Sequence, residues 1–250
     1  MSQKPYGVLI LHGFTSSLDC VREIEPPLKA LGLPTRMPVL RGHNAESPEA
    51  LRGVTWRDWV TDAEFALQDL LSEVERVIVI GHSMGGLVAL TLAADHGEKL
   101  DSIILAAANV QLKTPFSPGK PLNFLTPLLP VIFKKWDLAQ KNYADQSLAQ
   151  YDTNYLWTPT DALYSLFDFT KVTRKRLAEV RTPALIIQSH NDSSVEPKSV
   201  EIIYHQISTP VELKRIVWFE KSEHEMFRDC ERVAIIDVIV NYVHERIGAK

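Results

Sequence analysis

Cysteine is scarce in this sequence: Cys20 and Cys230 are the two present in 250 residues, and they stand far apart. Neither their number nor their spacing fits a zinc-binding cluster or the disulfide framework of a small secreted domain. We therefore expect two buried or half-buried thiols in a reducing compartment, with a single long-range disulfide as the alternative. A chain of this length buries enough apolar surface to fold without metal ions or disulfides.

Long apolar runs and an excess of positive charge are also missing. The apolar run at residues 8–11 is much shorter than a signal-peptide core, and no run approaches the roughly 20 residues of a membrane helix. Lysine and arginine number 27 against 31 acidic residues, without the basic stripe that a phosphate backbone requires. We expect a cytoplasmic protein with no membrane segment and no nucleic-acid partner. The oligomeric state stays open.

Nucleotide-binding and metal-binding patterns are missing as well. The glycines at residues 81–86 do not follow G-x-G-x-x-G, and no Walker A lysine comes after them. Several histidines show no metal-ligand spacing, and we assign them structural or surface positions: His43, His82, His96, His190, His205 and His244. We expect neither a metal ion nor a cofactor.

Short apolar strands alternate with helices along the chain. Strands are predicted at residues 8–11, 36–40, 76–80, 102–106, 184–188 and 213–219. Helices are predicted around residues 21–31, 55–72, 87–94 and 230–247. This alternation predicts the α/β class, with one domain over residues 1–250 and a mainly parallel sheet that carries helices on both faces.

One segment, from about residue 110 to 160, breaks this alternation. It holds six of the fifteen prolines together with many large apolar side chains. A long insertion between a strand and a helix that is apolar rather than polar is more typical of a lid than of a linker. We therefore predict an inserted cap at residues 110–160.

Residues 81–86, Gly-His-Ser-Met-Gly-Gly, contain the G-x-S-x-G pattern of a nucleophile elbow. Ser83 would occupy a strained turn, and only small residues fit beside it. A helix begins directly afterwards, and its first amides and its dipole favour negative charge at that point. The pattern follows a strand and opens a helix, which is the context that the motif requires. A purely structural Gly-Ser turn is the alternative.

The partners of such a serine follow later in the chain, first the acid and then the histidine. Asp192 lies in a polar loop after a predicted strand, and its alternative role is to cap a turn or helix. His224 lies in the loop after the last predicted strand, between two glutamates, and its alternative is an exposed histidine without a function. We predict that Ser83, Asp192 and His224 form a catalytic triad.

The chemistry requires all three residues and two further donors. His224 takes the proton of Ser83 and later gives it to the leaving group, while Asp192 orients the imidazole. The tetrahedral intermediate carries an oxyanion, for which we predict the amides of Met84 and Phe14 as donors. The alternative for the second donor is that His12-Gly13 is simply a tight turn.

Five motifs carry a family resemblance: residues 11–15, 38–43, 81–86, 183–187 and 192–195. Over nearly its whole length the chain resembles the bacterial carboxylesterase and monoacylglycerol lipase group of α/β-hydrolases. The resemblance implies the α/β-hydrolase fold with a small cap, Ser83, Asp192 and His224 as the triad, and Phe14 and Met84 as the oxyanion-hole pair. It also implies short to medium acyl esters as substrates, including monoacylglycerols, and no cofactor.

The sequence departs from this group at two places. Asn44 stands where the group usually has a second glycine, so we expect that loop to bend differently. The chain begins almost at its first parallel strand, so we expect the antiparallel hairpin that is common at the start of the fold to be missing.

We therefore expect a carboxylic-ester hydrolase that acts through an acyl-enzyme on a small-molecule ester. The same fold hosts C–C bond hydrolases and acyltransferases, and the fold alone does not choose among them. Epoxide and haloalkane hydrolases are disfavoured, because their nucleophile is an aspartate and this elbow carries Ser83. The alternative from another class is a non-catalytic receptor that keeps the pocket.

Overall fold

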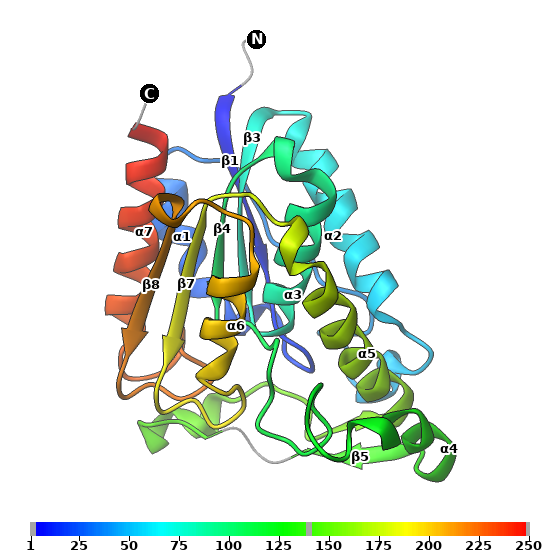
Figure 1. Ribbon diagram of the computed structural model, residues 1–250. Coiled ribbons are helices and arrows are strands. Elements are labelled where there is room, and N and C mark those ends of the chain that lie inside the picture. Colours follow the sequence, from blue (N-terminus) through cyan, green and yellow to red (C-terminus); the bar gives the residue numbers. More distant parts are fainter. Residues whose placement is uncertain (1–3, 139–141, 249–250) are drawn as a thin grey trace.

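A sheet of six strands forms the centre of the computed structural model, which describes residues 4–138 and 142–248 (Figure 1). In spatial order the strands are β2 (Thr35–Arg36), β1 (Lys4–Leu11), β3 (Val74–His82), β4 (Leu100–Ala106), β7 (Ala184–Ser189) and β8 (Lys214–Phe219). Every pair of neighbours in this sheet is parallel. The predicted mainly parallel sheet is confirmed.

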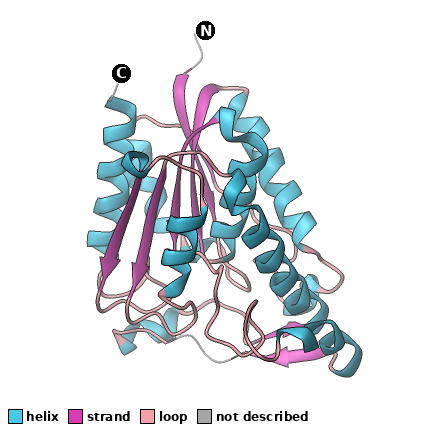
Figure 2. Cartoon of the chain, viewed as in Figure 1, coloured by secondary structure: helices cyan, strands magenta, loops and turns pink. Residues whose placement is uncertain are grey.

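Helices cover both faces of the sheet (Figure 2). One face carries α2 (Trp56–Leu71), α3 (Met84–His96), α5 (Thr160–Arg176) and α6 (Lys198–Gln206), and the other carries α1 (Glu25–Ala30) and α7 (Arg232–Gly248). Successive side chains of a strand point to opposite faces. Leu9 and Leu11 of β1 therefore pack into the core beneath α2, α3, α5 and α6, whereas Val8 and Ile10 pack into the core beneath α1 and α7.

Two predicted elements are shorter than expected, and prolines explain both. The helix predicted at residues 21–31 begins only at Glu25, after two 3₁₀ turns at Leu18–Cys20 and Arg22–Ile24. Pro26 and Pro27 lack an amide hydrogen and fit only the first turn of a helix, which places its start here. The strand predicted at residues 36–40 is the two-residue β2, and Pro38 cannot donate to a continuing ladder.

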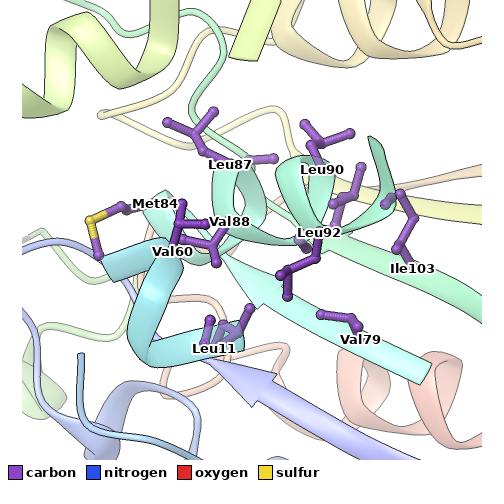
Figure 3. Close-up of a cluster of buried hydrophobic side chains, with 14 of the residues drawn as sticks. Leu11, Val60, Val79, Met84, Leu87, Val88, Leu90, Leu92 and Ile103 are labelled. Carbon is purple, nitrogen blue, oxygen red and sulfur yellow. The ribbon is translucent and has the colours of Figure 1, made fainter. Parts of the chain in front are cut away.

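Helix α3 is buried from Met84 to Ala93, and Figure 3 shows Leu87, Val88, Leu90 and Leu92 of this helix in a cluster of buried apolar side chains. Its first turn approaches β1 and β3 so closely that side chains are excluded. A Cβ atom added to Gly81 would lie 2.2 Å from the carbonyl oxygen of Gly85, and one added to Gly85 would lie 2.3 Å from that of Leu11. Both glycines are therefore required by backbone contact.

The segment between β4 and α5 lies at the carboxyl ends of the strands, where Figure 1 shows it in green. Its elements are short: the 3₁₀ helix Asn123–Leu128, α4 (Leu129–Ile132), β5 (Lys135–Asp137), the 3₁₀ helix Gln146–Tyr151 and β6 (Trp157–Pro159). Strands β5 and β6 form an antiparallel pair. The inserted cap predicted at 110–160 falls on this segment and on the first residue of α5, and its residues 139–141 lie outside the described residues; its role as a cap stays a prediction. We call residues 110–160 the cap segment.

Two further expectations concern the thiols and membranes. Cys20 is buried and Cys230 is exposed, and neither forms a disulfide. The prediction of buried or half-buried thiols is thus wrong for Cys230, which lies on the surface just before α7. Within residues 4–138 and 142–248, no helix is long and apolar enough to cross a membrane.

The close approach of α3 to β1 gives a stability prediction. We expect Gly85→Ala to lower the free energy of unfolding by more than about 2 kcal/mol, because the new methyl group meets the backbone of Leu11 and His12. The measurement is urea unfolding followed by circular dichroism. Gly248→Ala is the control, since a Cβ atom there meets no atom within 4 Å. Equal midpoints for the two variants would contradict the prediction.

Candidate active site

Ser83 stands at the turn between β3 and α3, in a backbone conformation that few side chains adopt. Its φ is 54° and its ψ is −114°. The turn is held from both sides: the amide of Ser83 donates to the carbonyl of Ala106 at 2.9 Å, and its carbonyl accepts from the amide of Gly86 at 2.9 Å. Strain of this kind persists only where the surroundings fix it, and it is concentrated at functional sites.

The three residues predicted as a triad come together at the carboxyl edge of the sheet. Asp192 lies in the loop after β7 and His224 in the loop after β8. The Nε2 atom of His224 lies 2.9 Å from the hydroxyl oxygen of Ser83, and its Nδ1 atom lies 2.9 Å from Oδ2 of Asp192. All three side chains are buried. The arrangement is a continuous chain of hydrogen bonds from carboxylate to hydroxyl.

Asp192 is stabilised as a carboxylate. Burial by itself raises its pKa, but the charge and hydrogen bond of His224 and the amides of Val195 and Ser194 lower that pKa to about 2. Those two amides donate to Oδ1 at 2.9 and 2.8 Å, and the side-chain amide of Gln188 donates to Oδ2 at 3.0 Å. An ionised Asp192 accepts the Nδ1 proton of His224, which leaves Nε2 free to accept from Ser83.

The two predicted oxyanion donors come from different parts of the chain: Met84 directly follows Ser83, and Phe14 lies in the loop after β1. Met84 is the first residue of α3, so its amide has no carbonyl partner within the helix. Phe14 follows β1, and its side chain lines the same cavity as Ser83. The next residue, Thr15, has a φ of 62°, and its hydroxyl donates to the carbonyl of Phe14 at 2.6 Å. The role of both amides stays a prediction.

A cavity of about 360 Å³ opens beside Ser83 and His224. Its apolar wall comes from the cap segment and from α5, with Leu112, Phe116, Leu129, Trp136, Leu138, Leu163, Leu166 and Phe167. Its polar wall comes from Asn109, Lys113, Thr114, Asn142, Ser193 and Ser194. Among the lining residues that the structure describes, no aspartate or glutamate occurs.

Sequence reasoning missed the part that neutral histidines play around the site. Nδ1 of His12 donates to the carbonyl of Gly13 at 2.9 Å, while its Nε2 accepts from the amide of Leu40 at 3.0 Å. Nε2 of His82 donates to the carbonyl of His224 at 2.9 Å. Burial lowers the pKa of both side chains to about 4. The sequence signal available was their position, directly after β1 and directly before Ser83.

Behind the elbow lies one group of side chains with the donor types of a metal site. Ligand atoms of Cys20, His82 and Glu225 lie within 4.8 Å of one another, and all three residues are buried. Burial, followed by the charge of Glu225, raises the pKa of the Cys20 thiol to about 12. A metal ion binds the thiolate, so binding here would have to displace the thiol proton, and we keep the expectation that this group holds no metal ion.

Asn44, the departure from the usual glycine, has a φ of 53°. Asparagine tolerates this left-handed region better than most residues with a side chain. The loop therefore adopts at Asn44 a conformation that glycine favours. In the part of the chain that the structure describes, the main sheet holds no antiparallel pair.

Comparison with known proteins gives matches over most of the chain. The family described as serine aminopeptidase, S33, matches residues 3–231. The chain is 29% identical over 245 residues to a thermostable monoacylglycerol lipase of Bacillus sp. (strain H-257), which covers 98% of this chain and 92% of that protein. It is 25% identical over 228 residues to a carboxylesterase of Bacillus subtilis (strain 168), which covers 90% of this chain and 87% of that protein. The resemblance to this bacterial group is confirmed.

Solved structures give the same result for the fold. A structure from work on LipS and LipT, two metagenome-derived lipolytic enzymes, has a TM-score of 0.84 at 25% identity and covers 97% of this chain and 95% of that chain. A soluble variant of monoglyceride lipase from Saccharomyces cerevisiae has a TM-score of 0.80 at 15% identity, covering 98% of this chain and 88% of that chain. These likenesses confirm the predicted α/β-hydrolase fold.

The buried histidines give a prediction for stability against pH. Burial lowers the pKa of His12 and His82 to about 4 and that of His43 to about 3, from 6.5. Protonation therefore favours the unfolded chain, so stability is complete above about pH 6.5 and falls as pH drops toward 4. Each of these histidines contributes up to about 1.4 kcal/mol per pH unit in that window.

The measurement is the urea midpoint at pH 7.5, 6.5 and 5.5 for the native chain and for His43→Phe. The phenyl ring keeps an aromatic contact with Phe14 and Trp59 but does not titrate. We expect lower stability at all pH values, from the lost hydrogen bonds, but a smaller decrease between pH 6.5 and 5.5. The exposed His244→Gln is the control. An unchanged slope in His43→Phe would refute the assignment.

Proposed function

The chain belongs to the hydrolase family described as serine aminopeptidase, S33, and we propose that it is a carboxylic-ester hydrolase that forms an acyl-enzyme on Ser83. The observation that carries this proposal is the chain of 2.9 Å contacts from Asp192 through His224 to Ser83. A serine hydroxyl is a poor nucleophile near neutral pH unless a base within hydrogen-bond distance removes its proton. We assign the role of this base to His224, whose Nε2 atom lies 2.9 Å from the hydroxyl oxygen of Ser83.

The reaction then follows from the positions of the three side chains. Ser83 Oγ attacks the ester carbonyl carbon as its proton passes to Nε2 of His224, and the ionised Asp192 stabilises the resulting imidazolium. The tetrahedral intermediate then collapses: the carbon–oxygen bond to the alcohol breaks, the imidazolium gives its proton to the leaving oxygen, and the acyl group stays on Ser83. Water then attacks the acyl-enzyme, with His224 again as base, and releases the carboxylic acid.

We assign the oxyanion to the amides of Phe14 and Met84. The first turn of α3 adds its unpaired amides and its dipole at the same place, which favours negative charge there. The close contact of Gly85 with β1 fixes that turn relative to the loop that carries Phe14. Donors held in place before the reaction cost no reorganisation when the charge develops.

The cavity favours esters over peptides as substrates. An aminopeptidase binds the positively charged amino terminus of its substrate, for which a carboxylate is the natural partner. The described lining residues include Lys113 but no acidic side chain, so such a terminus has no partner there. The apolar wall suits an acyl chain instead, and about 360 Å³ fits one of short to medium length. The names of the two bacterial relatives, a monoacylglycerol lipase and a carboxylesterase, support the same substrate class.

We assign residues 110–160 the role of a cap over the acyl pocket. Phe116, Leu129 and Trp136 of this segment line the cavity and pack with Leu163 and Phe167 of α5 in one apolar cluster. The acyl chain would lie between the cap segment and α5. A cytoplasmic location fits the free thiols of Cys20 and Cys230, and the proposed partner is a small-molecule ester without a cofactor.

The nucleophile is tested by Ser83→Ala. We expect the initial rate of p-nitrophenyl ester hydrolysis to fall by at least about 10⁴-fold, since removal of the attacking oxygen leaves only the binding contributions. The assay runs on a ladder from acetyl to palmitoyl, and labelling of Ser83 by a fluorophosphonate probe is measured in parallel. A variant with the native rate would disprove the proposal. If the probe labels Ser83 of the native chain but no ester of the series is hydrolysed, the result would favour C–C bond hydrolysis or acyl transfer.

The acyl pocket is tested by Leu163→Trp. A larger side chain on α5 reduces the cavity from its apolar wall, so the preferred chain on the same ladder should become shorter. We expect kcat/KM for the longest accepted ester to fall by about tenfold or more relative to the acetyl ester. Leu156→Trp is the control, because that side chain is 63% exposed and is not a lining residue. An unchanged chain-length profile in Leu163→Trp would place the acyl chain elsewhere.

A further inference from the structure

The loop that carries His224 contains a second buried carboxylate, Asp229, which the reaction does not use. Its side chain is fully buried and accepts hydrogen bonds from four backbone amides. Oδ2 accepts from Ala144 at 2.8 Å and from Glu223 at 2.7 Å. Oδ1 accepts from Asp145 at 3.1 Å and from Cys230 at 2.7 Å. The four lone-pair positions of an ionised carboxylate are thereby filled.

These four amides come from two parts of the chain that are far apart in sequence. Ala144 and Asp145 belong to the cap segment, whereas Glu223 directly precedes His224. One carboxylate therefore connects the cap segment to the loop that carries the proposed base. Hydrogen bonds from amides to an ionised acceptor are about twice as strong as neutral ones, so this connection is stiff.

Neighbouring contacts strengthen the same connection. The guanidinium of Arg228 donates to the carbonyl of Tyr151, and the side-chain amide of Asn154 donates to Oε1 of Glu225 at 3.3 Å. Glu225 and Arg228, which follow His224, thus contact the second half of the cap segment, residues 142–160. That half also reaches the loop of the proposed oxyanion donor, because the amide of Tyr155 donates to the carbonyl of Thr15 at 2.8 Å.

The first half of the cap segment, residues 110–138, differs in the kind of side chain that it exposes and in its contacts. Between Leu122 and Phe133 it exposes large apolar side chains, among them Phe124 at 73%, Val131 at 74% and Ile132 at 64%. Leu129, Phe116 and Trp136 form its apolar contacts beside the cavity. Its polar contacts reach the loop of Asp192, because the amide of Lys113 donates to the carbonyl of Ser194 and its ammonium donates to the carbonyl of Asp192. Among the described residues, the hydrogen bonds between the cap segment and the loop of His224 come from its second half.

We propose that Asp229 is a positioning residue: through Glu223 it fixes the backbone of His224, and through Ala144 and Asp145 it fixes the second half of the cap segment to the same loop. The inference rests on the proposed function of His224 as the base. Placement of the base and placement of the pocket wall are then coupled by one side chain. An error of about 1 Å in the position of a catalytic group costs on the order of 10²-fold in rate.

The experiment compares Asp229→Asn with a matched variant of the cap segment, Asp145→Asn. Asparagine keeps the shape of Asp229, but its NH₂ group faces amide donors and accepts none of them. Asp145→Asn weakens a turn within the cap segment, where the carboxylate binds Ser147, and leaves the connection to Asp229 through the backbone. Both variants are assayed per active site, counted by fluorophosphonate titration, so that loss of folded protein does not affect the result.

We expect Asp229→Asn to lower kcat by about 10- to 100-fold and to raise KM for the longest accepted ester, with partial rescue by Asp229→Glu, which restores the charge. Asp145→Asn should stay within about threefold of the native chain. Native kcat and KM in Asp229→Asn, per titrated site, would overturn the proposal. So would equal losses in the two variants, since these would indicate general weakening of the cap segment.

Amide hydrogen exchange in the native chain tests the connection independently of activity. It does not require any variant to fold. In the native chain the amides of Ala144, Asp145 and Glu223 should be protected to a similar degree, because they share one acceptor. Exchange of Ala144 and Asp145 at the rate of a free peptide would overturn the proposal. If the native chain hydrolysed no ester, the function proposed above would fail, while this exchange measurement would still decide whether the connection exists.

Discussion

The close approach of the first turn of α3 to β1 is the constraint on which the site depends. Gly85 allows the helix backbone to touch the carbonyl of Leu11, and Gly81 allows β3 to turn into α3 without a spacer. Ser83 is thereby held at a φ of 54°, with its hydroxyl at the carboxyl edge of the sheet. The same contact sets the distance between the amide of Met84 and the loop that carries Phe14. The backbone strain at Ser83 is thus offset by burial of the apolar side chains of α3, the helix that begins directly after this turn.

The parallel sheet brings the other two members of the proposed triad to this turn. Strands β7 and β8 are neighbours and parallel, so the loops that follow them emerge at the same edge. Burial of a carboxylate at that edge is unfavourable unless it is paired. Asp192 meets this requirement with two backbone amides, Gln188 and His224. The loop amides that stabilise Asp192 as a carboxylate also make it the acceptor of the Nδ1 proton of His224, the proposed base.

The sequence was sufficient to predict the elements whose signals are local. Ser83 follows an apolar strand and opens a helix, and Asp192 and His224 each follow a strand, so pattern and chain order located them. Contacts between distant segments leave no such pattern. One partner of His12 is the amide of Leu40, and two of the four partners of Asp229 are amides of the cap segment, where any residue except proline offers the same donor. The wrong start of the helix predicted at residues 21–31 has a local cause, because Pro26 fits only the first turn of a helix and α1 therefore begins at Glu25.

The two halves of the cap segment suggest how a pocket can vary while the catalytic geometry stays fixed. Hydrogen bonds are directional, and those of Asp229 and Arg228 hold the second half to the loop of His224. Apolar contacts are not directional, and those of Leu129 and Trp136 tolerate exchange of one large side chain for another of similar volume. Changes in acyl preference are therefore least costly at apolar lining residues such as Leu129 and Trp136, and in α5. Changes in the second half would act on the base as well as on the substrate, because the pocket wall and His224 share one buried carboxylate.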